Sequence, residues 1–149
     1  MKLTQLAAAA ALSLALAAPS IAAPLSADHY LLTPAVLAKF KAMEADGKKM
    51  GLKDEDKDDG KDEKDDKDES IEGLIRKIDA NPKMKALLAK YGMSSKEFAL
   101  ATMASFHAGF YVMMEASMDK KGAADLYKGY TKEQQANIAL MRATYKPAK

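Results

Sequence analysis

The sequence predicts an all-α fold, a single-domain helical bundle of about four to five helices. Several stretches show the 3.6-residue apolar period of amphipathic helices, and none shows the sustained alternation of a half-buried strand. The stretch from Phe98 to Met114 carries no charged side chain, although 30% of the chain is charged. A helix that is apolar on nearly every side must be surrounded by other elements. We therefore expect the shorter helices to pack around this one.

The first 22 residues have the three parts of a secretory signal peptide. Lys2 provides the positive start, residues 6–18 form an apolar run, and Ser20 and Ala22 suit a cleavage site. The apolar run is too short to cross a bilayer stably. We expect the signal peptide, 1–22, to be removed. The helical domain, 23–149, is then periplasmic or secreted, in a bacterium, and does not span the membrane.

Composition argues against several classes of protein. The chain contains no cysteine, and therefore no disulfide, no thiolate nucleophile and no cysteine-based zinc site. Its lysines are scattered and its arginines number two, which argues against a nucleic-acid partner. No nucleophile, base and orienting group stand together in a catalytic pattern. We expect a protein that is not an enzyme.

The first helix is expected to begin at Thr33 and Pro34 and to end at Gly47. Threonine is a favourable N-cap, and proline at the first helical position loses no hydrogen bond because its N–H would be unpaired there. The apolar face of this helix repeats at helical spacing and consists of Val36, Leu37, Phe40 and Met43.

Residues 53–69 form a low-complexity charged linker that interrupts the helical domain. The linker holds five lysines against eleven acidic residues, a net charge of −6, whereas the rest of the mature chain carries +7. It has no apolar side chain to offset the entropy lost on ordering its backbone, so we expect a disordered insert. The opposite charges also allow the linker to fold over the basic domain, an interaction that salt weakens.

The acidic residues of this linker approach the spacing of a calcium-binding EF-hand loop. Asp54, Asp56 and Asp58 match ligand positions 1, 3 and 5. The glycine required at position 6 comes one place late, at Gly60, and position 12 is Asp65 in place of glutamate. The sequence therefore predicts no more than a loose attraction of Ca²⁺ to these carboxylates.

Two short helices follow the linker and are separated by Asn81 and Pro82. Ser70 is the expected N-cap of the first, Asn81 is that of the second, and Gly92 is expected to close the second. Their apolar residues recur at helical spacing: Ile71, Leu74, Ile75 and Ile78, then Met84, Leu87, Leu88 and Tyr91.

The central helix is expected to span residues 94–121. Ser94 and Glu97 form a capping box at its start, and Gly122 can adopt the left-handed conformation that ends a helix. Three small residues fall every fourth position and allow another helix to approach closely: Ala101, Ser105 and Gly109. The large apolar residues are expected to fill the core: Phe98, Phe106, Phe110, Met113 and Met114.

His107 lies in this helix with Met103 one turn before it and Tyr111 one turn after it, so the three residues share one face. An imidazole and a thioether can hold copper(I), or a b-type haem as axial ligands, although both sites need a further ligand. The structural alternative is a hydrogen-bonded histidine. Asn137, in the last helix, is the expected partner in a buried polar pair that fixes helix register. These four residues form the candidate binding site.

After an expected loop at 122–130, Thr131 and Gln134 form a second capping box. The inner face of the last helix is expected to consist of Ile138, Met141 and Tyr145.

Residues 130–134, Tyr-Thr-Lys-Glu-Gln, resemble the Leu-Thr-x-x-Gln motif of the small helical periplasmic chaperones and metal-stress proteins of the bacterial envelope. That family is also exported, basic, cysteine-poor and methionine-containing, and its members bind metals or hold unfolded clients. The motif occurs once here, where the family has two copies, with Tyr130 in place of leucine. The resemblance covers five residues and implies no site residue.

These observations favour a non-enzymatic exported binding or interaction module, with a protein or a small ligand of the envelope as its partner. One alternative is an envelope-stress protein, either a holdase chaperone or a divalent-metal buffer. The other is a copper or haem site at His107 inside the bundle.

Overall fold

A computed structural model of the protein describes residues 25–52, 68 and 70–144. Within these ranges the regular structure is entirely helical, which confirms the predicted all-α fold and adds one helix to the expected number. The elements in chain order are η1 (Ala27–His29, a 3-10 turn), α1 (Pro34–Lys49), α2 (Ile71–Ala80), α3 (Pro82–Lys90), α4 (Ser95–Glu115), α5 (Lys120–Gly129) and α6 (Lys132–Thr144). The expected signal peptide, the candidate ligands Asp54, Asp56 and Asp58, and Tyr145 lie outside the described residues.

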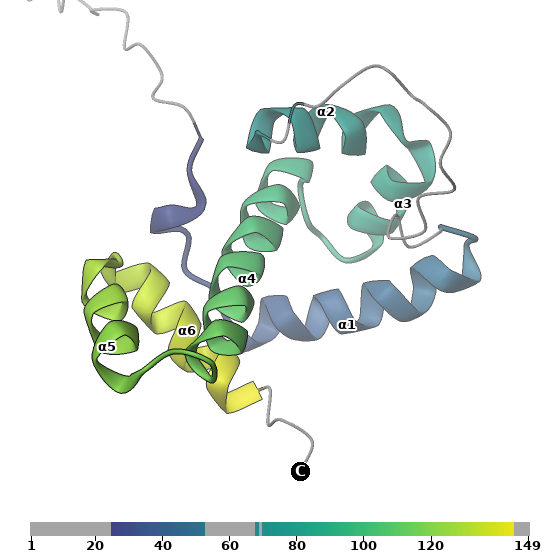
Figure 1. Ribbon diagram of the computed structural model, residues 1–149. Helices are drawn as coiled ribbons and strands as arrows, with labels where there is room; N and C mark the ends of the chain where they lie inside the picture. The colour runs from purple at the N-terminus through teal and green to yellow at the C-terminus, as the bar shows by residue number, and fades with distance from the viewer. Residues whose placement is uncertain (1–24, 53–67, 69, 145–149) are drawn as a thin grey trace, which may run out of the picture.

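Helix α4 lies at the centre of the arrangement (Figure 1). Helices α5 and α6 lie on one side of it, and α2 and α3 lie toward its N-terminal end. Helix α1 extends from beside the C-terminal half of α4 to α3. The contact between α4 and α6 is the most extensive in the fold, followed by that between α4 and α2.

The helix starts are set by the polar caps that the sequence indicates. The predicted N-caps that accept a hydrogen bond from the first helical turn are Thr33, Ser70, Asn81 and Ser94. The capping box of α6 is reciprocal: Gln134 N–H donates to Thr131 Oγ1 at 3.1 Å, and Thr131 N–H donates to Gln134 Oε1 at 3.0 Å. Gly92 follows α3 with φ of 60°, the left-handed conformation that closes a helix.

The central helix is shorter than predicted, and the loop expected at 122–130 is largely helical. Helix α4 ends at Glu115, and α5 begins at Lys120. The physical reason is Asp119, whose carboxylate Oδ1 accepts hydrogen bonds from the N–H groups of Lys121 and Gly122, at 3.0 and 2.8 Å. Asp119 is therefore an N-cap. Gly122, expected to end one helix, lies in the first turn of the next.

The buried apolar residues form two clusters along α4. The first joins α1, α2, α3 and the N-terminal half of α4, and the second joins the C-terminal half of α4 to α6. The buried residues that α4 itself contributes are mostly small: Ala99, Ala101, Ala104, Ala108 and Tyr111. Neighbouring elements therefore approach α4 along a seam of alanines.

Candidate functional site

Asn137, the one buried polar residue among the described residues, connects α6 to the segment before α1. Its Oδ1 accepts a hydrogen bond from the backbone N–H of Leu32 at 2.8 Å. Its Nδ2 donates to the backbone carbonyl of Tyr30, also at 2.8 Å. Gln134, one turn earlier, donates through Nε2 to Asp28 Oδ1 at 2.9 Å. Residues 28–32 are thus bound to α6 by side-chain amides.

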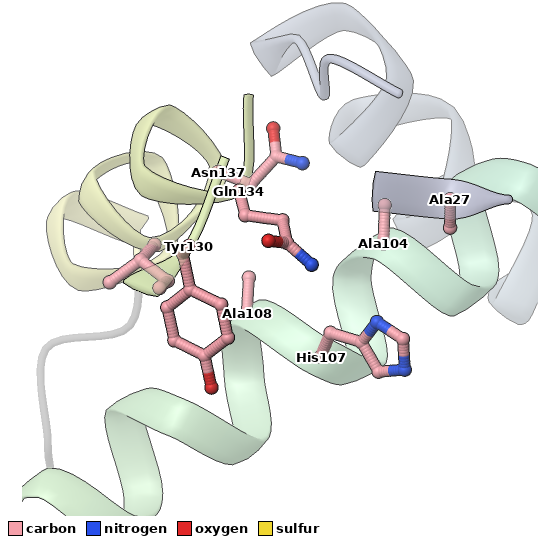
Figure 2. Close-up of a pocket in the computed structure, with 8 residues that line it drawn as sticks. Ala27, Ala104, His107, Ala108, Tyr130, Gln134 and Asn137 are labelled. Atoms are coloured by element: carbon pink, nitrogen blue, oxygen red, sulfur yellow. The ribbon is translucent and has the colours of Figure 1, made fainter. Parts of the chain in front are cut away.

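The predicted buried pair of His107 and Asn137 does not form. Asn137 uses its amide on backbone groups, and His107 is exposed. Figure 2 shows the imidazole of His107 directed away from the amide of Asn137, although both residues line one small cavity. The cavity measures about 10 Å³, which is close to the space of a single water molecule. The register of α4 and α6 therefore does not depend on this histidine.

Met103 and Tyr111, the other two candidate binding residues, belong to different parts of the core. Met103 packs against the first cluster, whereas Tyr111 is 2% exposed in the second. The hydroxyl of Tyr111 donates to the backbone carbonyl of Ala123 at 2.8 Å and so fastens α5 to α4. Met103 and Tyr111 therefore pack in the core, whereas His107 faces solvent, and the three residues do not form one binding surface.

The described residues contain neither a metal-binding cluster nor a helix suited to crossing a membrane. No group of three or more histidine, cysteine, aspartate or glutamate side chains converges there as a metal-binding cluster. None of the helices in the described ranges combines the length and the apolar character that crossing a membrane requires.

The C-terminal half of α4 carries an exposed apolar stripe that the apolar period of the sequence does not predict. Its residues are Phe106 (62% exposed), Phe110 (51%), Met113 (66%) and Met114 (39%), hereafter the α4 stripe. The rings of Phe106 and Phe110 stack on each other with centroids 6.1 Å apart. The expectations that these residues fill the core and that other elements surround the helix are wrong here, because the alanine side of α4 faces its neighbours.

An apolar groove of about 380 Å³ opens between α1, α3 and α4, on the N-terminal half of α4. Its wall on α4 consists of Phe98, Thr102 and Ser105. Its other lining residues come from α1, α3 and the segment after α1: Phe40, Met43, Glu44, Gly47, Lys48, Leu52, Met84 and Leu87. The hydroxyl of Ser105 is buried without a hydrogen-bond partner among the described residues, a condition that native structures rarely tolerate.

A polar contact joins α1 to the end of α3, next to Gly47 in the groove wall. The carboxylate Oδ2 of Asp46 on α1 accepts hydrogen bonds from Lys90 Nζ at 2.5 Å and from the hydroxyl of Tyr91 at 2.8 Å. Hydrogen bonds from Lys90, Tyr91 and Lys49 hold the pKa of the Asp46 carboxyl below its ordinary value. The contact therefore favours the ionised carboxylate.

A second anchor lies at the C-terminal end of α4. The guanidinium of Arg142 on α6 donates to both carboxylate oxygens of Glu115, with 2.9 Å between Nε and Oε1. This arrangement lowers the pKa of the Glu115 carboxyl. The same guanidinium lies over the rings of Tyr111 and Tyr127, 5.6 and 5.4 Å from their centroids.

Comparisons of the chain with protein-family models, with curated proteins and with solved structures gave no match. The surface that α4 presents is the structural feature that bears on function.

Proposed function

We propose that the protein is a non-enzymatic binding module of the bacterial envelope that holds an apolar segment of another polypeptide. The observation that carries this proposal is that α4 buries small residues and exposes large apolar ones. Its buried positions are mostly alanine, whereas four of its large apolar side chains are exposed in the α4 stripe. Contiguous exposed apolar patches of this kind mark interaction surfaces, because leaving them in water costs free energy that core packing would recover.

The shape of the surface favours a polypeptide over a small molecule. A groove of about 380 Å³ falls within the usual size range of small-ligand pockets. A small ligand enclosed there would, however, leave Phe106, Phe110 and Met113 in water. An apolar segment of a polypeptide is long enough to fill the groove and also to cover the stripe. Amphipathic helices and extended segments both bind such surfaces through regularly spaced apolar anchors.

The same surface supports the alternative of an envelope holdase, since unfolded clients expose apolar segments of many sequences. Methionine and phenylalanine side chains suit variable partners, because methionine is flexible and polarisable and can adapt to different shapes. The signal-like N-terminus supports export, and hence a partner in the periplasm or outside the cell.

The proposal is tested by mixing the protein with insulin whose disulfides are reduced by dithiothreitol, and by following aggregation through light scattering. The protein contains no cysteine, so the reductant leaves it unchanged. We expect the wild-type protein to suppress aggregation. We expect the double variant Phe106→Ser/Phe110→Ser to require about tenfold more protein for the same effect, as loss of exposed aromatic anchors weakens binding by at least this factor.

The matched control is Leu126→Ser on α5, which removes another exposed apolar side chain (43% exposed) outside the α4 stripe. It should retain wild-type suppression. Circular dichroism should show the same helix content in all variants, since every altered side chain is exposed. Equal suppression by the wild-type protein and the double variant, or none by the wild-type protein, would overturn the proposal.

A further inference from the structure

We infer that the groove between α1, α3 and α4 binds a small, uncharged and mainly apolar molecule with one hydrogen-bonding oxygen, of which a medium-chain alcohol is the simplest example. The groove lies on the N-terminal half of α4 and the α4 stripe on the C-terminal half, so a ligand in the groove leaves the stripe available to a client. A client segment that enters the groove as well competes with this ligand. Small-molecule binding is therefore an activity beyond the proposed function.

The groove has the volume and the lining of a small-ligand pocket. Its volume of about 380 Å³ lies near the lower end of the usual range, roughly 300–1,000 Å³, so the ligand is small. The lining is mainly apolar, and its methionines can adapt to the shape of a ligand. Its apolar side chains are Phe40, Met43, Leu52, Met84, Leu87 and Phe98. These side chains favour a ligand whose surface is largely hydrocarbon.

The lining residues extend along two helices, which favours a chain-like ligand over a compact one. On α4 they run from Phe98 to Ser105, a rise of about 10 Å along the helix axis. On α1 they run from Phe40 to Lys48, a rise of about 12 Å. A flexible alkyl chain can follow such an elongated surface, and each methylene group that leaves water adds to the affinity.

Ser105 provides the polar group that orients the ligand. Its hydroxyl oxygen is covered by protein atoms and has no hydrogen-bond partner among the described residues. A buried hydroxyl without a partner costs free energy, which a hydrogen bond from a ligand recovers. The oxygen is a single bond away from Cβ, so rotation about χ1 between staggered positions directs it into the groove that Ser105 lines. A ligand oxygen is therefore favoured over a plain hydrocarbon.

The charged residues of the groove favour an uncharged ligand. Glu44 and Lys48 are the two in its lining, and they form an ion pair with 2.7 Å between Oε1 and Nζ. A carboxylate ligand would meet the like charge of Glu44, and an ammonium ligand would meet that of Lys48, both of which are unfavourable. An uncharged ligand leaves the pair intact.

The inference is tested by NMR titration of the protein without client, isotope-labelled at its methionine methyl groups, with n-octanol as the probe. Met43 and Met84 report on the groove, and Met113 and Met114 report on the α4 stripe. We expect the methyl resonances of Met43 and Met84 to shift along a saturating curve while those of the stripe stay in place. The dissociation constant should fall about fourfold with each methylene from n-hexanol to n-octanol. Octanoate, the matched anion, should bind more weakly.

The variant Ser105→Ala separates a role in binding from a role in folding. It removes a hydroxyl that has no partner and introduces a better helix former, so the melting temperature of the unliganded protein should stay the same or rise. Its dissociation constant for n-octanol should rise about three- to tenfold, the effect of losing one hydrogen bond. The control is Phe110→Ser, which alters the stripe and should bind n-octanol with wild-type affinity.

Shifts confined to Met113 and Met114, or shifts that do not saturate, would overturn the inference. Unchanged affinity in Ser105→Ala, or octanoate that binds as tightly as n-octanol, would also overturn it, because the ligand would then not be an uncharged molecule held by this hydroxyl. These outcomes are distinguishable from failure of the proposed function, which is measured separately by suppression of insulin aggregation. A protein that suppresses aggregation but does not bind n-octanol would remove the groove site alone.

Discussion

The backbone N–H of Leu32 donates a 2.8 Å hydrogen bond to Oδ1 of Asn137, although 105 residues separate the two in the chain. The other half of the amide donates to the carbonyl of Tyr30, so one side chain satisfies two backbone groups of a segment that belongs to no helix. Asn137 is 1% exposed. The segment before α1 is thereby bound to the last helix and becomes part of the core.

We predict that Asn137→Leu destabilises the protein by about 1–3 kcal/mol. The substitution removes the partner of the buried Leu32 N–H, and a buried donor left without an acceptor costs roughly this amount. The free energy of unfolding, measured by urea denaturation, should fall accordingly. The matched substitution His107→Leu alters an exposed side chain and should change stability by less than about 0.5 kcal/mol. Equal losses in the free energy of unfolding of the two variants would instead indicate that His107 and Asn137 form a buried pair.

The helix starts could be predicted from the sequence because an N-cap acts on the first turn of its own helix. The N-caps that act in this way are Thr33, Ser70, Asn81 and Ser94. The start of α5 could be read in the same manner from Asp119. Gly122, however, also fits the residue that ends the preceding helix, so the sequence pattern alone predicts one long helix there. A glycine near a helix end is ambiguous, since it is tolerated inside a helix at a modest cost.

The partners of Asn137 are not encoded by local pattern, and the apolar period alone does not predict the exposure of the α4 stripe. The amide of Asn137 binds backbone atoms more than 100 residues away, and backbone atoms leave no mark in the sequence. Periodicity gives no orientation to a helix that is apolar all round. Here a spacing of alanines resolves the ambiguity: Ala101, Ala104 and Ala108 follow i, i+3 and i+7 and form the buried side.

Asp46 should make the stability of the protein depend on pH in the acid range. Hydrogen bonds, first from Lys90 and then from Tyr91 and Lys49, hold its folded-state pKa below the value in the unfolded chain, which is about 3.9. Its contribution to stability is therefore fully present above about pH 4 and is lost as the pH falls toward the folded-state pKa. In Asp46→Asn, we expect lower stability at pH 7 and a smaller further loss between about pH 4 and 2.

The measurement is urea denaturation of both proteins at a series of pH values. Asp125→Asn is the control, because Asp125 is exposed and its ion pair with Lys128, at 3.5 Å, lies within one helix. Such pairs contribute little to stability. An unchanged difference in stability between wild type and Asp46→Asn from pH 7 to pH 2 would contradict the assignment.

Two glycines should respond to alanine with opposite signs. Gly129 ends α5, and a Cβ atom there would meet nothing within 4 Å, so Gly129→Ala should raise stability by about 0.5 kcal/mol through helix propensity. Gly73 lies in the first turn of α2, where a Cβ atom would overlap the backbone carbonyl of Asp68. Gly73→Ala should therefore destabilise by about 1–3 kcal/mol. Thermal unfolding of both variants measures the two signs, and a stabilised Gly73→Ala would show that Asp68 moves aside freely.

Arg142 should matter more for the docking of α5 than for global stability. Helix α5 contains no buried residue, and Tyr127 of α5 packs on Tyr111 with the guanidinium of Arg142 over both rings. Arg142→Ala removes these contacts and the two hydrogen bonds to the Glu115 carboxylate. We therefore expect the free energy that holds α5 against α4 to fall by about 1–2 kcal/mol. Arg142→Lys keeps the positive charge but lacks the planar guanidinium that binds both carboxylate oxygens, so it should recover only part of that loss.

Hydrogen exchange of backbone amides distinguishes this local effect from general unfolding. If Arg142 fastens α5, the amides of residues 120–129 should exchange faster in Arg142→Ala, while those of α2 and α3 keep their protection, because elements held by few buried contacts open independently. Glu115→Gln leaves the guanidinium over the tyrosine rings and should therefore accelerate exchange in α5 less. Uniformly faster exchange in all helices of Arg142→Ala would instead place Arg142 in the global core.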